Sequence, residues 1–324
     1  MTDGNGLVRA YLLDGAGGGR PLDWPGVRRW TLEEGFLWVH LDRAVEAARQ
    51  WLAAESGLSQ LACEALLAED TRPRSAEFED GLIVILRGVN LNPGADPEDM
   101  VSIRLWIDRH RVISVRLRQL MAVSDLCAGL DAAKGPQGPA DFLVDLAARL
   151  VERMGPVIDG FEDEADDVEN AVLASVGYAL RGRLGELRRR VIALRRYIAP
   201  QRDVMARLVT ERVPWLDDLH RMRLRETADR ITRYVEDLDA VRDRAAVTQD
   251  ELSSRLGEQM NRNMYVLAIV AGVFLPLGLL TGLLGINVGG IPGADTSWAF
   301  AAVAVGLGVL GAIELWVLKR FGWI

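Results

Sequence analysis

The stretch MYVLAIVAGVFLPLGLLTGLLGI, residues 264–286, contains no Asp, Glu, Lys, Arg or His. At a rise of ~1.5 Å per residue, a helix of this length crosses a ~30 Å hydrocarbon core with some tilt. A second apolar run, residues 298–318, carries one charge, Glu314, and is followed by KRFGWI, in which Lys319, Arg320 and Trp323 make an interfacial anchor. The sequence therefore predicts two transmembrane helices joined by a short loop.

The charges that flank these two runs predict their orientation. Arg255 and Arg262 precede the first span and Lys319 and Arg320 follow the second, whereas the connecting loop carries only Asp295. Lys and Arg are enriched in cytoplasmic segments. The N-terminal MTDGNGLVRA also lacks the apolar core of a secretory signal. We therefore expect both termini in the cytoplasm.

Composition excludes several classes of protein. The two cysteines, Cys63 and Cys127, are far apart and the three histidines stand alone, so neither a disulfide framework nor a structural zinc site is expected. The formal net charge of -8 argues against a nucleic-acid partner and favours a cationic one. Phosphate-binding loops, nucleophile elbows and His-Glu-x-x-His motifs are missing from the sequence, so we expect neither an enzyme nor a bound cofactor.

Residues 1–135 are expected to form a cytosolic mixed α/β domain. Four β-rich runs, LVRAYLLD, GFLWVHLD, FEDGLIVILRGVN and MVSIRLWIDRHRVISVRL, predict strands, and the last run breaks at a hairpin turn over residues 108–111. Two helical patterns, AVEAARQWLAAES and SQLACEALLAED, lie between the second and third runs, and Ser59 is a candidate N-cap. We expect a mixed sheet with helices on its faces, followed by a linker at residues 134–140.

Residues 136–262 are expected to form a helical hairpin and a long stalk helix. One amphipathic pattern covers residues 141–175 and a second covers 178–209; Pro214 then interrupts, and Asp217 or Asp218 can stabilise the start of a third helix. Gly257 costs only ~1 kcal/mol, so this helix should continue to residue 284, a length of about 100 Å. The expected fold class is thus an α+β membrane protein: a mixed α/β domain, a helical stalk (funnel), and two transmembrane helices in residues 263–324.

Two spans in one chain cannot enclose a water-filled path, because polar backbone at membrane depth must be covered. Either the protein is a membrane-anchored sensor without a pore, or several copies form a ring. The first span carries a stripe at steps of three and four residues, with Asn287 just past its end: Asn261, Met264, Leu267, Ala271, Leu275, Gly278 and Gly282. Such a stripe fits a pore with an apolar constriction and a wider outer vestibule. Helix packing through Gly278-x-x-x-Gly282 is the alternative, and the pattern alone favours it.

The segment Gly285-Ile286-Asn287 closes the first span, after NRNMYVLAIVAGVFLPL and before a second span with a basic-aromatic tail. In this context it resembles the signature of the CorA-type metal-ion transporters, the two-span Gly-x-Asn family. TRPRSAEFEDGLIVILRGVNLNP likewise resembles the family's cytosolic Arg-Pro strand segment, so the resemblance covers nearly the whole chain. Ile286, with NVGGIPG, DTRPR and RGVNLNP, is similar to the zinc-transporting ZntB branch. The magnesium and cobalt branch usually has Met at the middle position, then an aromatic residue where this chain has Val288.

The resemblance implies a homopentamer in the bacterial cytoplasmic (inner) membrane whose first span lines a central pore that moves zinc. It implies that Asn287 forms an outer ring around the hydrated cation, and that Asn261, Met264 and Leu267 are the inner pore positions. Five amide oxygens can hydrogen-bond the first-shell waters of a divalent ion without removing them. The alternatives are magnesium or cobalt transport of the CorA kind, or a non-conducting membrane-anchored cytosolic sensor.

Two further charged features each have two interpretations. The acidic run DGFEDEADDVEN could attract or bind a regulatory metal, or its charges could be neutralised by the arginine-rich helix that follows. Its candidate acids are Asp159, Glu162, Asp163, Asp166 and Asp167. Glu314 is an intramembrane charge, which is a functional candidate by default. Because it lies about one turn from Lys319 and Arg320, we expect it to reach the interface or pair there, on a helix that faces lipid.

Overall fold

The computed structural model describes residues 5–69, 71–78, 81–175, 177–211, 213–285, 293 and 296–321. The chain divides into two compact units, Met1–Gln249 and Asp250–Ile324. The first contains the α/β domain and most of the helical region, and the second contains the two apolar helices. The expected boundaries at residues 135 and 262 stay predictions.

The described part of the first unit is built on a seven-stranded sheet with the order β2-β1-β3-β7-β6-β5-β4. Strands β3 and β7 pair in parallel and every other neighbouring pair is antiparallel, so the sheet is mixed, as predicted. The strands are β1 Leu7–Leu13, β2 Gly19–Pro21, β3 Phe36–Asp42, β4 Arg74–Phe78, β5 Gly81–Gly88, β6 Val101–Ile107 and β7 Arg111–Arg116.

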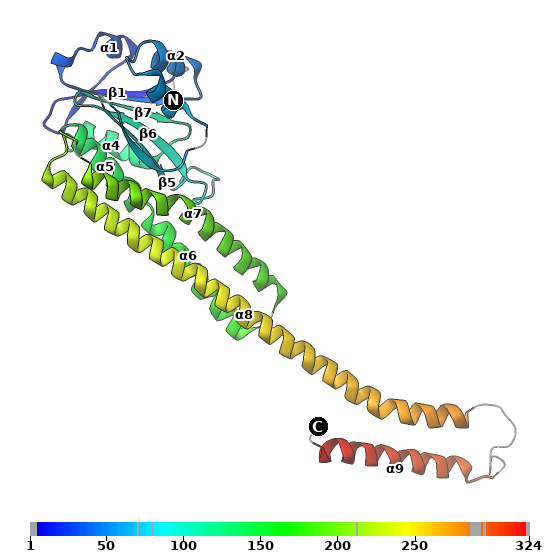
Figure 1. Ribbon diagram of the computed structural model, residues 1–324. Coiled ribbons are helices and arrows are strands. Elements are labelled where there is room, and N and C mark those ends of the chain that lie inside the picture. Colours follow the sequence, from blue (N-terminus) through cyan, green and yellow to red (C-terminus); the bar gives the residue numbers. More distant parts are fainter. Residues whose placement is uncertain are drawn as a thin grey trace. The chain divides into compact units, whose positions relative to one another are not determined.

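Helices cover both faces of the sheet (Figure 1). One face packs on α1 Trp24–Arg29, α2 Glu46–Ala54 and α3 Gln60–Leu67, the last entered through the predicted cap, because Ser59 accepts a hydrogen bond from the Ala62 amide at 3.3 Å. The short 3-10 turn η1 is Leu32–Glu34. The other face packs on α4 Met121–Asp131 and α5 Pro139–Glu152, where Phe142 meets Trp38 edge-on with 4.9 Å between ring centroids.

The pattern expected as one helix over residues 141–175 is two helices, α5 and α6 Gly155–Ala174. The break lies at Arg153 and Met154, directly before Gly155-Pro156. Proline lacks an amide proton and fits only the first turn of a helix, so a new helix starts here. Helix α7, Tyr178–Thr210, then follows as predicted.

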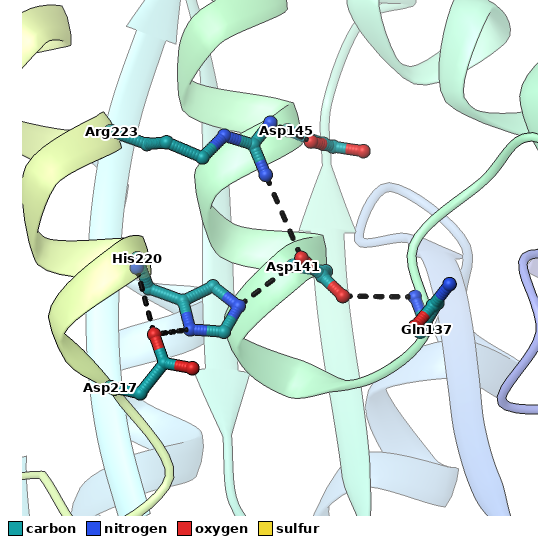
Figure 2. Close-up of polar contacts among 6 residues, drawn as sticks. All are labelled: Gln137, Asp141, Asp145, Asp217, His220 and Arg223. Carbon is teal, nitrogen blue, oxygen red and sulfur yellow. Dashed lines mark hydrogen bonds and ion pairs between the residues drawn. The ribbon is translucent and has the colours of Figure 1, made fainter.

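Helix α8 is a single element, Asp218–Leu284, and neither Gly257 nor Pro276 ends it. The side chain of Asp217 accepts a hydrogen bond from the His220 amide at 2.9 Å, which confirms the expected acidic start. The His220 ring lies between two carboxylates, with Nε2 at 3.1 Å from Asp141 and Nδ1 at 2.5 Å from Asp217 (Figure 2). Arg223 reaches Asp145 at 2.6 Å, so charged groups join the start of α8 to α5.

The second unit consists of the C-terminal part of α8 and helix α9, Ala299–Arg320. Both helices are long and apolar enough to cross a membrane, and their most apolar windows are unburied within the protomer. The α9 residues that are partly covered recur at helical spacing: Ala299, Val303, Leu307, Leu310, Gly311, Glu314 and Leu318. The position of a Cβ on Gly311 would lie 4.0 Å from Leu277, so α9 turns this face toward α8.

Candidate ion pathway

The predicted stripe lies on α8 and is almost entirely uncovered. Met264, Leu267 and Leu275 expose 62%, 69% and 70% of their surface. Asn261, Gly278 and Gly282 are also exposed, and Ala271 is half-buried. Large apolar side chains left bare in this way must contact lipid or another protein surface.

The opposite face of the same segment is partly covered. Its half-buried positions away from the stripe are Ile269, Val273, Pro276 and Leu277. Because successive residues of an α-helix are ~100° apart, Val273 and Leu275 point in nearly opposite directions. Leu277 is the residue that approaches Gly311 of α9. The second helix therefore packs on one face of α8 and leaves the rest of this segment uncovered, which includes the stripe and also Phe274 and Leu279.

The apolar segment of α8 satisfies its own polar groups. The Thr281 hydroxyl donates to the carbonyl oxygens of Leu277 and Gly278, at 3.0 and 3.1 Å. This internal bonding is common for Thr inside helices. No stripe residue between positions 264 and 282 is titratable. The stripe thus offers no ligand that would bind a cation tightly.

The helix ends at the predicted selectivity motif. The Gly285 amide donates to the carbonyl oxygens of Thr281 and Gly282, at 2.9 and 3.2 Å, directly after the last helical residue. Ile286 and Asn287 lie outside the described residues. Their roles stay predictions.

The acidic face of α6 is only partly neutralised. Among the five predicted acids, the described ion pairs include one, Asp166, and its partner is Arg244 of α8 instead of an arginine of α7. Arg244 also reaches Glu169 at 2.8 Å. The expected α6–α7 pairing occurs at Glu164, which Arg190 contacts at 2.9 Å. Most of the run is therefore a solvated face.

Carboxylates crowd where α6 meets α8. Burial, followed by the charges of Asp237, Asp159 and Asp166, raises the pKa of Glu162. Burial, followed by Glu236 and Asp159, raises the pKa of Asp237. Within the described ranges, however, no three His, Cys, Asp or Glu side chains are arranged to hold a metal ion. The cluster therefore creates a negative electrostatic potential, but its described carboxylates are not arranged as the ligands of a metal ion.

The interfacial position expected for Glu314 stays a prediction. The residue falls on the partly covered face of α9, three residues from Gly311, and its Oε2 atom is buried without a hydrogen-bond partner among the described residues. The described ion pairs do not join it to Lys319 or Arg320. Gly311 on the same face lies toward Leu277 of α8, so this side of the carboxyl group faces the helix pair.

The cysteines and histidines all lie in the first unit. Cys63 is buried and donates to the Leu52 carbonyl oxygen at 3.2 Å, as expected for a packing residue. Cys127 is half-buried and free. His110 is exposed in the β6–β7 turn, whereas His40 is completely buried in β3.

Comparison with known proteins identifies a family with this architecture. Residues 33–320 match the family model described as CorA-like Mg2+ transporter protein. The chain is 44% identical to the divalent cation transporter CmaX of Pseudomonas aeruginosa, over 99% of this chain and 98% of that protein. It is 37% identical to the zinc transport protein ZntB of Pectobacterium carotovorum subsp. carotovorum, over 99% and 97%.

A solved structure of full-length CmaX matches with a TM-score of 0.86 and 43% identity, covering 99% of each chain. The mixed α/β domain, the long helical stalk and the two C-terminal apolar helices are therefore a shared architecture. The chain belongs to the CorA-like Mg2+ transporter family and is a membrane protein that transports divalent cations, not an enzyme.

Proposed function

We propose that this protein moves zinc across the bacterial cytoplasmic membrane, through a central pore formed by a homopentamer. The observation that carries the proposal is the uncovered stripe of α8, which lies opposite the face that α9 packs on. Five copies of the stripe facing one axis would enclose a path that a single pair of helices cannot. Both termini would then lie in the cytoplasm.

The chemistry of the stripe suits a hydrated ion. Asn261 stands at its cytoplasmic end and Asn287 just beyond its outer end, with apolar side chains between them. An amide ring can hold the water shell of a divalent cation without removing it, and uncharged walls let the ion leave again. Met264 and Leu267 are the bulkiest residues near the cytoplasmic end, and rings of these side chains would form a constriction that closes by dewetting.

Zinc is the proposed ion because Ile286, Val288 and the surrounding loop are similar to the ZntB branch, and a ZntB protein is among the relatives. The alternative of the same fold is magnesium or cobalt. The acidic side chains of α6 create a negative electrostatic potential that concentrates cations near the stalk. The other alternative, a non-conducting sensor, would show no cation flux in a transport assay.

The test is cation uptake into proteoliposomes that contain the purified full-length protein and a zinc-sensitive dye. We expect zinc uptake above that of empty liposomes, and little loss of that uptake when magnesium or cobalt is added in excess. Asn287→Ala should reduce selective uptake at least about tenfold, the effect of losing one ring of amides that hydrogen-bond the hydrated ion. Asn170→Ala on α6 makes the same chemical change on an exposed helix face and should leave uptake unchanged.

Two results would overturn the proposal. Uptake equal to that of empty liposomes would favour the sensor, and complete competition by magnesium alone would assign the other branch. Wild-type uptake and selectivity in Asn287→Ala would remove the outer-ring assignment. Size-exclusion chromatography with light scattering, run on the same samples, checks that the variant keeps the mass of the wild-type oligomer.

A further inference from the structure

A cavity of about 630 Å³ lies between the sheet and α4. It opens on the sheet face that carries Trp38 and His40, away from the core formed with α1, α2 and α3. Its volume is in the range of small-molecule sites. Polar and titratable side chains from three strands and one helix line it: Arg9, Tyr11, His40, Arg116, Cys127 and Asp131.

His40 is the buried polar group of this cavity wall. Its exposed fraction is 0%. The Nδ1 atom lies 2.8 Å from the Ser114 hydroxyl, which also accepts a hydrogen bond from the Trp38 indole at 2.8 Å. The Nε2 atom is buried and has no hydrogen-bond partner in the described part of the chain. Leaving such an atom unpaired is costly, so a partner in the cavity would be stabilising.

Strand register brings two arginines to this ring. Arg9 lies opposite His40 in the β1–β3 pair. Ser114 lies opposite His40 in the β3–β7 pair, and Arg116 follows two residues later on the same face of the sheet. The Nε atom of Arg116 is also buried without a hydrogen-bond partner among the described residues. Two cationic groups therefore flank an imidazole whose second nitrogen is unpaired.

The tyrosine and the cysteine of this cavity add no negative charge beside the two arginines. The Tyr11 hydroxyl donates to Asp131 at 3.2 Å, and burial is the main cause that raises the pKa of Tyr11. Burial also raises the pKa of Cys127, so both groups are neutral near pH 7. The charged groups on the elements around His40 are then two arginines, Arg9 on β1 and Arg116 on β7, and two acids, Asp42 on β3 and Asp131 on α4. The two arginines are the charges that act on the His40 ring, whereas Asp42 acts on Arg116 and Asp131 accepts a hydrogen bond from Tyr11.

We propose that this cavity binds a doubly charged oxyanion, either free phosphate or the phosphate group of a small metabolite, through Arg9, Arg116 and the Nε2 atom of His40. Guanidinium groups form paired, charge-assisted hydrogen bonds with oxyanions. A purely structural histidine would account for the Ser114 contact but leaves the second nitrogen unexplained. The inference concerns the cytosolic unit and is independent of the ion that the membrane unit transports.

Binding is coupled to protonation of His40. Burial followed by the charges of Arg116 and Arg9 lowers the pKa of His40 to about 3. An anion between the arginines opposes their effect and accepts a hydrogen bond from Nε2–H. The charged ring would then donate to the anion and to Ser114, whose hydroxyl lies 3.2 Å from the Val39 carbonyl oxygen that accepts its proton. The bound state therefore takes up a proton, and affinity rises as pH falls.

Isothermal titration calorimetry of the full chain in detergent tests both steps with sodium sulfate as the probe. Sulfate stays doubly charged between about pH 6 and 8, so any proton taken up comes to the protein and not to the ligand. We expect one site per protomer and tighter binding at the lower pH. Comparing two buffers with different ionisation enthalpies should show uptake of part of a proton per sulfate. His40→Gln should abolish that uptake.

The arginine variants identify the site. Arg116→Gln should weaken sulfate binding at least about tenfold. The exposed Arg9→Gln should weaken it as well and keeps the test decisive if a variant of a buried position does not fold, which thermal unfolding of each sample checks. Arg29→Gln on α1 removes the same charge on the opposite face of the sheet and should bind as wild type.

Inorganic phosphate and glycerol 3-phosphate then distinguish the two sources of the anion. Tighter binding of inorganic phosphate supports the free ion, and tighter binding of the ester supports a phosphorylated metabolite. The proposal is overturned if none of the three anions binds at concentrations up to about 10 mM. Binding that survives both Arg116→Gln and Arg9→Gln would also overturn it.

Discussion

Two tryptophans show how differently the two units of this molecule are stabilised. Trp38, in the sheet of the first unit, is completely buried, stacks on Tyr11 and donates to Ser114. Trp316, in α9 of the second unit, exposes 66% of its surface. The first unit buries its apolar side chains against its own elements, whereas the second relies on lipid and on neighbouring copies. The first unit therefore buries its apolar side chains within one protomer, whereas the apolar helices of the second unit need an outside surface to cover them.

The same contrast divides helix α8. Before residue 253, buried apolar positions recur every three or four residues, as at Leu224, Ala228, Ile231, Val235 and Leu238. After it, large apolar residues such as Leu267 and Leu275 are bare. Packing within the protomer therefore explains the apolar positions before residue 253. It does not explain the apolar stripe that follows.

The largest expected effect is on folding of the first unit. Trp38→Ala removes a fully buried aromatic side chain, so we expect a loss of about 3–5 kcal/mol of stability. Trp316→Ala is the matched change in the second unit and should leave urea unfolding of the first unit unchanged. Circular dichroism of both variants in detergent is the measurement. Equal destabilisation by the two substitutions would break the comparison.

A second effect concerns the constriction. Met264→Ala or Leu267→Ala shortens a side chain on the bare face of α8, and we expect the zinc leak at rest to rise roughly tenfold as the apolar ring widens. Val273→Ala shortens a side chain on the face that α9 covers and serves as the control. Proteoliposome flux reports both. Unchanged leak at Met264 and Leu267 would place the gate elsewhere.

A third, smaller effect lies at the start of α8. Asp217→Ala removes the cap of the His220 amide and one of the two carboxylates beside the His220 ring. Loss of a helix N-cap costs about 0.5–2 kcal/mol. Thermal unfolding should show this loss, whereas Asp218→Ala, one residue further into the helix, should show less. The reverse order would assign the cap to Asp218.

The smallest effect is a pH dependence at the crowded acids. The folded pKa of Glu162 is raised above its unfolded value, so its contribution to stability is present at acidic pH and is lost as pH rises through the folded pKa. Glu162→Gln should therefore stabilise slightly at pH 7.5 and have no effect near pH 4. Melting temperatures at the two pH values test this. A loss of stability at pH 7.5 would show that attraction to Arg244 outweighs repulsion.

The sequence predicted most of the fold because its signals are local. Uninterrupted helical periodicity beyond Pro214 predicted α8, and the apolar runs predicted both membrane helices. The break between α5 and α6 was missed although Gly155-Pro156 is a recognisable stop signal. Strands β2 and β4 were not predicted as separate elements, because edge strands of three to five residues carry little periodic signal.

Site residues were predictable only where one helix holds them. The stripe could be predicted from residue spacing along α8. Only the structure shows that α9 packs on the opposite face of that helix. Arg9, His40 and Arg116 come from three strands that are distant in sequence, and only the β1–β3–β7 register joins them. The buried side of Glu314 likewise depends on which face of α9 meets α8, a packing choice that hydropathy does not encode.

The central claim is that the bare face of α8 lines the ion path, and substituted cysteines test it most directly. In a background with Cys63→Ala and Cys127→Ser, Leu275→Cys places a thiol on the stripe and Val273→Cys places one on the face toward α9. A charged, water-soluble methanethiosulfonate reagent should reduce zinc uptake at least about fivefold at position 275 and leave position 273 unaffected. Equal loss at both positions, or loss only at position 273, would contradict the account.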